Sequence, residues 1–136
     1  MKHGFVKAAA LTPGIRVADT GYNAGQIKKN MDEAAEQGAK IIVFPELCIT
    51  GYTCGDLFLQ QTLLTESKKE AARFVQTTAD CDMVVVFGMP LSIANALYNV
   101  AVTAYRGHIY GITVKTFLPN YNEFYEKRWF SSAREL

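Results

Sequence analysis

Residues 40–46 read Lys-Ile-Ile-Val-Phe-Pro-Glu, and the fold can be worked out from this stretch. A short run of β-branched and aromatic residues, ended by a proline, predicts a strand that is buried on both faces, as strands in parallel sheets are. The segment before it is typical of an amphipathic helix, because apolar residues recur at helical spacing on one side while charged residues fill the other. The apolar residues are Ile27, Met31, Ala34 and Ala35.

Both ends of this helix carry sequence signals. Asn23 can act as the N-cap, and Gly38 follows the helix where a left-handed C-cap is needed. An alanine-rich segment over residues 5–11, which Thr12-Pro13-Gly14 ends, predicts an earlier strand. Strand, helix and strand in this order form a βαβ unit, in which the two strands run parallel.

The remaining segments extend this unit. We predict one helix over residues 57–64, capped by Asp56, and another over 66–78. A strand is predicted over 82–87, where Gly88-Met89-Pro90 ends it. Strands 96–105 and 108–115 are predicted to form a hairpin around an Arg106-Gly107 turn. The fold class is therefore α/β, with a sheet that is parallel in part and then extended by a hairpin. Residues 116–136 are aromatic and charged without a clear period, and a segment this apolar should pack against something.

The composition excludes several classes of partner. The chain has 136 residues, 49% of them hydrophobic, and its 14 basic and 13 acidic residues leave a net charge of +1. This balance gives no electrostatic case for binding nucleic acid or an anionic membrane. No apolar run approaches the roughly 20 residues that cross a bilayer, and the N-terminus has no apolar core of signal-peptide type. We therefore expect a cytoplasmic protein with neither a membrane nor a nucleic-acid partner.

The three cysteines do not suggest a disulfide framework or a metal site. Their number is odd, Cys48 and Cys54 are not spaced as a CxxC pair, and no histidine lies near them. Free cysteines are usually buried as small apolar residues, and we expect the same of Cys48, Cys54 and Cys81.

Glu46 is the first candidate for chemistry. It directly follows the predicted strand 40–44, and in open parallel sheets ligands bind outside the carboxyl ends of the strands. A carboxylate there, next to apolar residues, would have its pKa raised by desolvation and could serve as a general base. The alternative is a glutamate that only caps or pairs at a loop.

Lys115 is the second candidate. It ends the second strand of the predicted hairpin, and its neighbours Ile112, Val114 and Phe117 are apolar. A lysine in such surroundings must pair with a carboxylate or lose its charge, whereas the alternative is a solvated lysine at a strand end. Because both candidates lie at the ends of predicted strands, we expect Glu46 and Lys115 to approach each other at one end of the sheet.

Two sequence signatures carry a family resemblance. Val43-Phe44-Pro45-Glu46-Leu47, followed by Thr50-Gly51-Tyr52, closely resembles the first signature of the nitrilase, or carbon–nitrogen hydrolase, superfamily. Lys115-Thr116-Phe117-Leu118-Pro119, with Phe124-Tyr125-Glu126-Lys127-Arg128 and Phe130, resembles the second. Residues 51–58 and 118–126 are similar in particular to the glutaminase domain of glutamine-dependent NAD synthetases. The resemblance runs the whole length of the chain.

The resemblance implies a fold and a set of roles. The fold would be an α-β-β-α layered sandwich, of which this chain is expected to supply the N-terminal portion, with part of both sheets. Glu46 would be the general base, Lys115 the cation beside the oxyanion, and Glu126 the supporting carboxylate, with Glu123 as the alternative. Tyr121 and Tyr52 would line the substrate pocket, or else pack in the core with satisfied hydroxyls.

The resemblance also implies a function. Residues 1–136 would be part of a glutaminase domain, with the nucleophilic cysteine several dozen residues beyond Lys115 and a synthetase domain further on. Glutamine would be the substrate, and the ammonia would pass to the synthetase domain, which uses ATP and Mg to amidate deamido-NAD. The glutaminase domain itself would need no cofactor. Cys48 is not expected to act as the nucleophile, so the chain alone should be inactive, and its uncovered surface should lead to a homo-oligomer.

Two alternatives remain at this stage. The chain could belong to another amidase or carbamoylase of the same superfamily, with a different acyl group. It could also be a non-catalytic α/β binding module.

Overall fold

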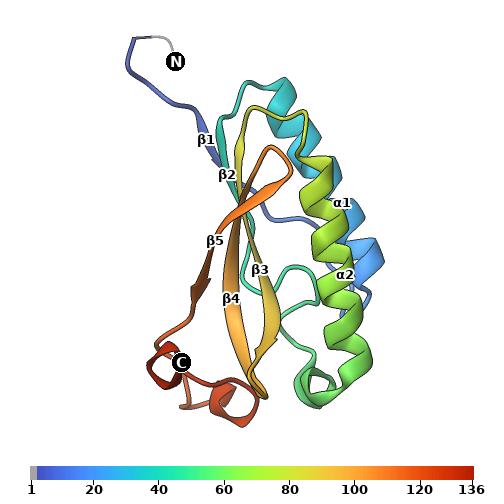
Figure 1. Cartoon of the computed structure of the whole chain (residues 1–136), viewed down its shortest axis with the longest axis vertical. Helices are drawn as coiled ribbons and strands as arrows, with labels where there is room; N and C mark the ends of the chain where they lie inside the picture. The colour runs from blue at the N-terminus through green and yellow to red at the C-terminus, as the bar shows by residue number, and fades with distance from the viewer. Residues whose placement is uncertain (1–2) are drawn as a thin grey trace.

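In residues 3–136, which the computed structural model describes, five strands form one mixed sheet (Figure 1). The strands lie across the sheet in chain order: β1 (Ala8–Ala10), β2 (Ile41–Val43), β3 (Val84–Ile93), β4 (Ala96–Tyr105) and β5 (His108–Val114). β1, β2 and β3 are parallel, whereas β4 is antiparallel to both of its neighbours. The α/β class and the parallel unit extended by a hairpin are confirmed.

The first helix, α1 (Thr20–Glu36), was predicted in outline but begins earlier than expected. Its N-cap is Asp19, whose side chain accepts a hydrogen bond from the Tyr22 N–H at 3.1 Å. Asn23 is not the cap, because its side chain is buried inside the first turn and donates to the Ile49 carbonyl at 3.0 Å. The left-handed conformation expected after the helix is confirmed at Gly38, where φ is +80°.

The second helix, α2 (Gln61–Thr77), replaces the two helices predicted over 57–64 and 66–78. Residues Leu63, Ser67, Ala71 and Phe74 are buried at successive helical turns, so one continuous face contacts the core and no break is required. A separate 3-10 turn, η1 (Gly55–Leu59), precedes the helix. Asp56 lies within that turn and therefore does not cap α2.

Strand β3 continues through Gly88-Met89-Pro90, which was predicted to end it. Its pairing with β2 stops at Val86, so Pro90 lies where β3 has a strand neighbour on one side only, and a missing N–H is tolerated there. The extension forms a second hairpin that was not predicted, around Ala94-Asn95. This turn and the predicted Arg106-Gly107 turn both have positive φ at their two central residues, as tight two-residue hairpin loops require.

The two helices pack on one face of the sheet (Figure 1), against a cluster that includes Ile27, Met31, Phe74, Val85 and Val100. In the described residues no helix covers the opposite face. The expectation that β2 is buried on both faces is therefore wrong, and so is the expectation that the chain supplies parts of two sheets. Alternate residues of the strands face outward here, and we call them the open face: Ile41, Val43, Val84, Val86, Ala101 and Thr113.

The aromatic segment after β5 folds back over one end of the sheet (Figure 1) and contains two short 3-10 turns, η2 (Glu126–Arg128) and η3 (Ala133–Glu135). Phe130 is buried, with its ring 5.0 Å from that of Phe58. Part of the segment therefore packs within the chain, while Phe117 and Tyr121 stay exposed. None of the helices in residues 3–136 has the length and apolar character that crossing a membrane requires.

Candidate active site

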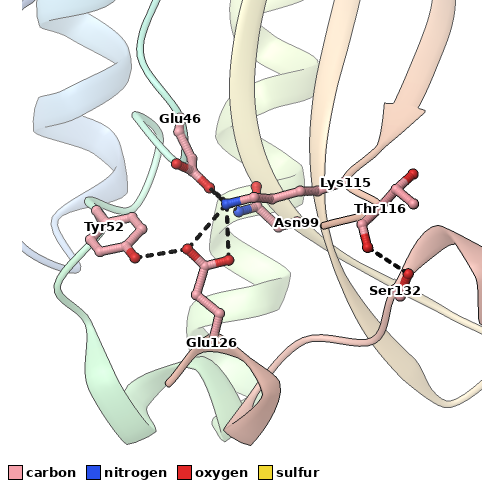
Figure 2. Close-up of polar contacts among 7 residues, drawn as sticks. All are labelled: Glu46, Tyr52, Asn99, Lys115, Thr116, Glu126 and Ser132. Carbon is pink, nitrogen blue, oxygen red and sulfur yellow. Dashed lines mark hydrogen bonds and ion pairs between the residues drawn. The ribbon is translucent and has the colours of Figure 1, made fainter. Parts of the chain in front are cut away.

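Three charged side chains from distant parts of the sequence meet at one end of the sheet (Figure 2). Lys115 Nζ lies 2.7 Å from Glu46 Oε1, 2.9 Å from Glu126 Oε2 and 3.1 Å from Glu126 Oε1. The predicted approach of Glu46 and Lys115 is confirmed. The catalytic roles of the three residues stay predictions.

The strand directions explain why Glu46 and Lys115 meet. β4 is antiparallel to both β3 and β5, so β5 runs in the same direction as β2 and β3. Glu46 closely follows β2 and Lys115 directly follows β5. Both residues therefore lie at carboxyl ends of strands, which is the edge of a parallel α/β sheet where ligands bind.

The return of the C-terminal segment brings Glu126 to the same place. The Ala133 N–H donates to the Lys115 carbonyl at 3.1 Å, and the Ser132 hydroxyl donates to the Thr116 carbonyl at 2.7 Å (Figure 2). These bonds tie the segment to the end of β5. Glu126 begins η2 inside the resulting loop and is only 2% exposed.

Lys115 is electrostatically suited to keep its charge. Partial burial alone lowers the pKa of Lys115, but the hydrogen bonds and charges of Glu46 and Glu126 outweigh this effect and raise the pKa above its usual range. The ammonium group is therefore positively charged at neutral pH. This is the state in which it can stabilise a developing negative charge on a substrate oxygen.

Glu46 is less buried than expected. Its side chain is 41% exposed, and its Oε1 accepts hydrogen bonds from Lys115 and Asn99. The predicted desolvation by apolar neighbours is therefore wrong, because the carboxylate lies at the rim of the sheet beside two donors. An accessible, oriented carboxylate can still accept a proton from a group placed next to it.

The two tyrosines differ in their relation to the cluster. The Tyr52 hydroxyl donates to Glu126 Oε1 at 2.7 Å (Figure 2), and burial together with this carboxylate raises the pKa of Tyr52. Tyr121 is 64% exposed and packs edge-on against Phe124 at 5.9 Å. Glu123 is exposed and makes no hydrogen bond or ion pair within residues 3–136. Of the two alternatives for supporting Lys115, Glu126 is the one in contact with it.

Asn99 was missed by the sequence analysis. It lies in β4 and is 3% exposed, and its side-chain amide donates to Glu46 Oε1 (Figure 2). Its backbone carbonyl accepts from the Lys115 N–H at 2.9 Å. The signal in the sequence was an amide between Tyr98 and Val100 in a largely apolar strand, since a buried amide needs a hydrogen-bonding partner.

The loop after Glu46 is held closely against β3. Leu47 is fully buried with φ at +51°, an uncommon conformation for a branched residue, and it turns the chain sharply. The Gly88 carbonyl accepts from the Ile49 N–H at 3.3 Å. Gly88 must be a glycine for this approach, because a Cβ there would lie 2.9 Å from Glu46 Cα.

Cys48 does not have the properties of a nucleophile. It is 1% exposed, and burial raises its pKa to about 12, so it is a neutral thiol at physiological pH. Its Sγ donates to the Gly88 carbonyl at 3.5 Å. Within the described part of the chain, no group of three His, Cys, Asp or Glu side chains could hold a metal ion. A hollow of about 300 Å³ beside Glu46, Asn99 and Lys115 leaves room for further atoms.

The fold and this cluster define an α/β protein with a glutamate–lysine–glutamate cluster at the carboxyl ends of its parallel strands. The chain belongs to the carbon–nitrogen hydrolase family, whose model matches residues 7–135. This membership argues against the alternative of a non-catalytic α/β binding module.

The chain is also similar to individual proteins of known sequence or structure. It is 38% identical over 127 residues to the glutamine-dependent NAD(+) synthetase of Mycobacterium tuberculosis, covering 93% of this chain and 19% of that one. The structure of a glutamine-dependent NAD(+) synthetase from Cytophaga hutchinsonii superposes with a TM-score of 0.88 at 30% identity, covering 93% and 22%. An amidase from Nesterenkonia sp. shares the fold, with a TM-score of 0.80 at 19% identity, covering 98% and 50%. The chain thus spans about a fifth of the length of the curated relatives it matches.

Proposed function

We propose that this chain is the N-terminal part of a glutamine amidohydrolase domain that supplies ammonia for NAD synthesis. The observation that carries the proposal is Lys115, paired at 2.7 Å with Glu46 and at 2.9 Å with the buried Glu126. The similarity to glutamine-dependent NAD(+) synthetases over nearly the whole chain supports the choice of substrate. Ligase activity, ATP and Mg belong, in this proposal, to a synthetase domain in the rest of a cytoplasmic protein.

The proposed mechanism is the one that the family resemblance implies, and the contacts of Lys115 with Glu46 and Glu126 support it. A cysteine thiolate from a later segment attacks the side-chain amide of glutamine, and Glu46 takes the thiol proton and passes it to the departing ammonia. Lys115, together with a backbone N–H, stabilises the oxyanion, and one such donor is worth about 3 kcal/mol. Water then hydrolyses the thioester. Glu126 holds Lys115 in place, and Tyr52 in turn holds Glu126. In this proposal the exposed Tyr121 contributes to the substrate pocket.

The test uses the complete gene product that carries this chain. Glu46→Gln should lower kcat for glutamine hydrolysis by about 10²- to 10⁴-fold, the usual contribution of a general base. Asp82→Asn, at the opposite end of the sheet, is the matched control and should leave kcat unchanged. A complete product of about 270–300 residues, or a preference for aliphatic amides over glutamine, would favour the alternative of another amidase or carbamoylase.

A second experiment concerns residues 1–136 alone. We expect them to release ammonia from glutamine only at background level, because Cys48 is buried and neutral. Turnover above background that disappears in Cys48→Ser would overturn the assignment of the nucleophile to a later segment.

A further inference from the structure

Asn99 is a buried polar side chain of the cluster that has no role in the proposed mechanism. Asn99 lies in β4, which has a strand neighbour on each side. It pairs with Pro90 of β3, and its backbone carbonyl accepts from the Lys115 N–H at 2.9 Å. Its side chain is oriented toward Glu46, as Figure 2 shows. A rigid strand therefore presents an amide donor to the proposed base.

The hydrogen bonds leave the two oxygens of Glu46 in different situations. Asn99 and Lys115 both donate to Oε1, and in residues 3–136 no donor reaches Oε2. Two donors on one oxygen restrict the rotation of the carboxylate, so Glu46 does not have to lose that rotational freedom when substrate binds. The free oxygen belongs to a side chain that is 41% exposed and borders the hollow beside the site.

Lys115 cannot provide this orientation alone throughout a reaction. An ammonium group has three N–H donors, and here it faces one oxygen of Glu46 and two oxygens of Glu126. When it turns a donor toward a substrate oxyanion, one of these contacts weakens. Asn99 is neutral and belongs to the sheet, so its hydrogen bond to Glu46 persists while Lys115 turns a donor toward the oxyanion.

We propose that Asn99 is a positioning residue that holds Glu46 Oε1, so that Oε2 remains free and aimed at the proton it must accept. The inference rests on the proposed function, since it assigns Glu46 the role of base. It predicts that losing the amide slows proton transfer without weakening substrate binding, because Asn99 acts only through Glu46.

The test has one kinetic and one spectroscopic arm. In the complete gene product, Asn99→Leu, which keeps the shape and removes the donor, should lower kcat for glutamine about tenfold and change KM less than about twofold. Thr103→Val, four residues further along β4, is the matched control and should change neither. In residues 1–136, NMR should show one Asn99 side-chain amide proton shifted downfield, and Glu46→Gln should reduce that shift.

Each outcome decides the question. An Asn99→Leu variant that folds and keeps its kcat, or whose kcat falls only as much as that of Thr103→Val, would overturn the inference. An Asn99 amide signal that does not respond to Glu46→Gln would also overturn it. If the complete protein does not hydrolyse glutamine, the proposed function fails, while the amide signal still decides whether Asn99 orders Glu46.

Discussion

At the scale of single residues, Lys115 and Glu126 depend on each other. Glu126 is 2% exposed, and its charge is balanced by Lys115 at 2.9 Å. Lys115→Met should lower the free energy of unfolding by about 1–3 kcal/mol, because it leaves a buried carboxylate without a counter-charge. This is less than for a fully buried pair, since the Lys115 side chain is 28% exposed. Urea unfolding at pH 7 measures the change.

Two further variants separate this effect from a general loss of charge. Adding Glu126→Gln to Lys115→Met should recover most of the lost stability, because the buried charge is then removed as well. Lys28→Met breaks the exposed pair with Asp32 and should change the free energy of unfolding by less than about 0.5 kcal/mol. Equal losses in Lys115→Met and Lys28→Met would show that Glu126 does not need its partner.

Gly88 gives a second prediction at this scale. A Cβ at this position would lie 2.9 Å from Glu46 Cα and from the Glu46 carbonyl carbon, so backbone atoms would have to move. Gly88→Ala should lower the free energy of unfolding by about 1–3 kcal/mol, the usual cost of overpacking. Gly111→Ala in β5 is the control, because no atom lies within 4 Å of its Cβ. If both variants unfold alike, Gly88 does not position Glu46.

Some site residues could be predicted from the sequence and others could not. Glu46 closely follows β2 and Lys115 directly follows β5, so their meeting at one end of the sheet follows from strand direction alone. The contact of Tyr52 with Glu126 and that of Asn99 with Glu46 depend on side-chain direction across 74 and 53 residues of separation. No local pattern fixes such a direction, because it is set by how the strands and the C-terminal segment pack.

At the scale of secondary-structure elements, local sequence again determines some bounds and tertiary packing determines others. Hydrophobic periodicity predicted α1, β2 and the β4–β5 hairpin close to their observed bounds. Predictions from periodicity were wrong where contact with a neighbouring element determines the bounds. The sequence predicts that Gly88-Met89-Pro90 ends a strand, but β3 continues through it, because beyond Val86 the strand pairs only with β4 and tolerates a proline. The prediction of two separate helices was wrong, because burial against the core, rather than capping, sets the length of α2.

The contact between η1 and η2 gives a prediction at the element scale. The Asp56 carboxylate accepts from Arg128 Nε at 2.7 Å and Nη2 at 2.8 Å, and from Trp129 Nε1 at 2.9 Å. These donors lower the pKa of Asp56 below its ordinary value of 3.8. Because the folded pKa is the lower one, the bond contributes stability above about pH 4 and loses it as the pH falls further.

Asp56→Asn should therefore lower the melting temperature by a few degrees at pH 7, and the difference from the unmodified chain should shrink as the pH falls from about 4 toward 2. The effect is modest because both side chains are exposed. Asp80→Asn, at an exposed position with no ion pair in the described residues, shows what the loss of one negative charge does by itself. A difference that is constant over this pH range would contradict the assigned role of the Asp56 carboxylate.

At the scale of the whole molecule, the open face and the β5 edge remain uncovered in residues 3–136. Ile41 is 39% exposed and Val43 is 46% exposed, and β5 pairs with β4 on one side only. Covering about 1,000 Å² of apolar surface is worth on the order of 25 kcal/mol before entropic costs. An unpaired strand edge adds free backbone donors and acceptors that can recruit another chain. We therefore expect residues 1–136 to self-associate.

We expect a two-fold dimer, because symmetric pairs are the commonest closed assembly of identical chains. Sedimentation of residues 1–136 at micromolar concentration should show a concentration-dependent shift from monomer to dimer. Val43→Lys places a charge on the open face and should weaken the association about tenfold or more, because a charge that is buried without a partner is costly. Ala72→Lys, on the exposed side of α2, adds the same charge and should leave the association unchanged. A clean monomer that also fails to bind a hydrophobic dye would show that the open face is stable in water.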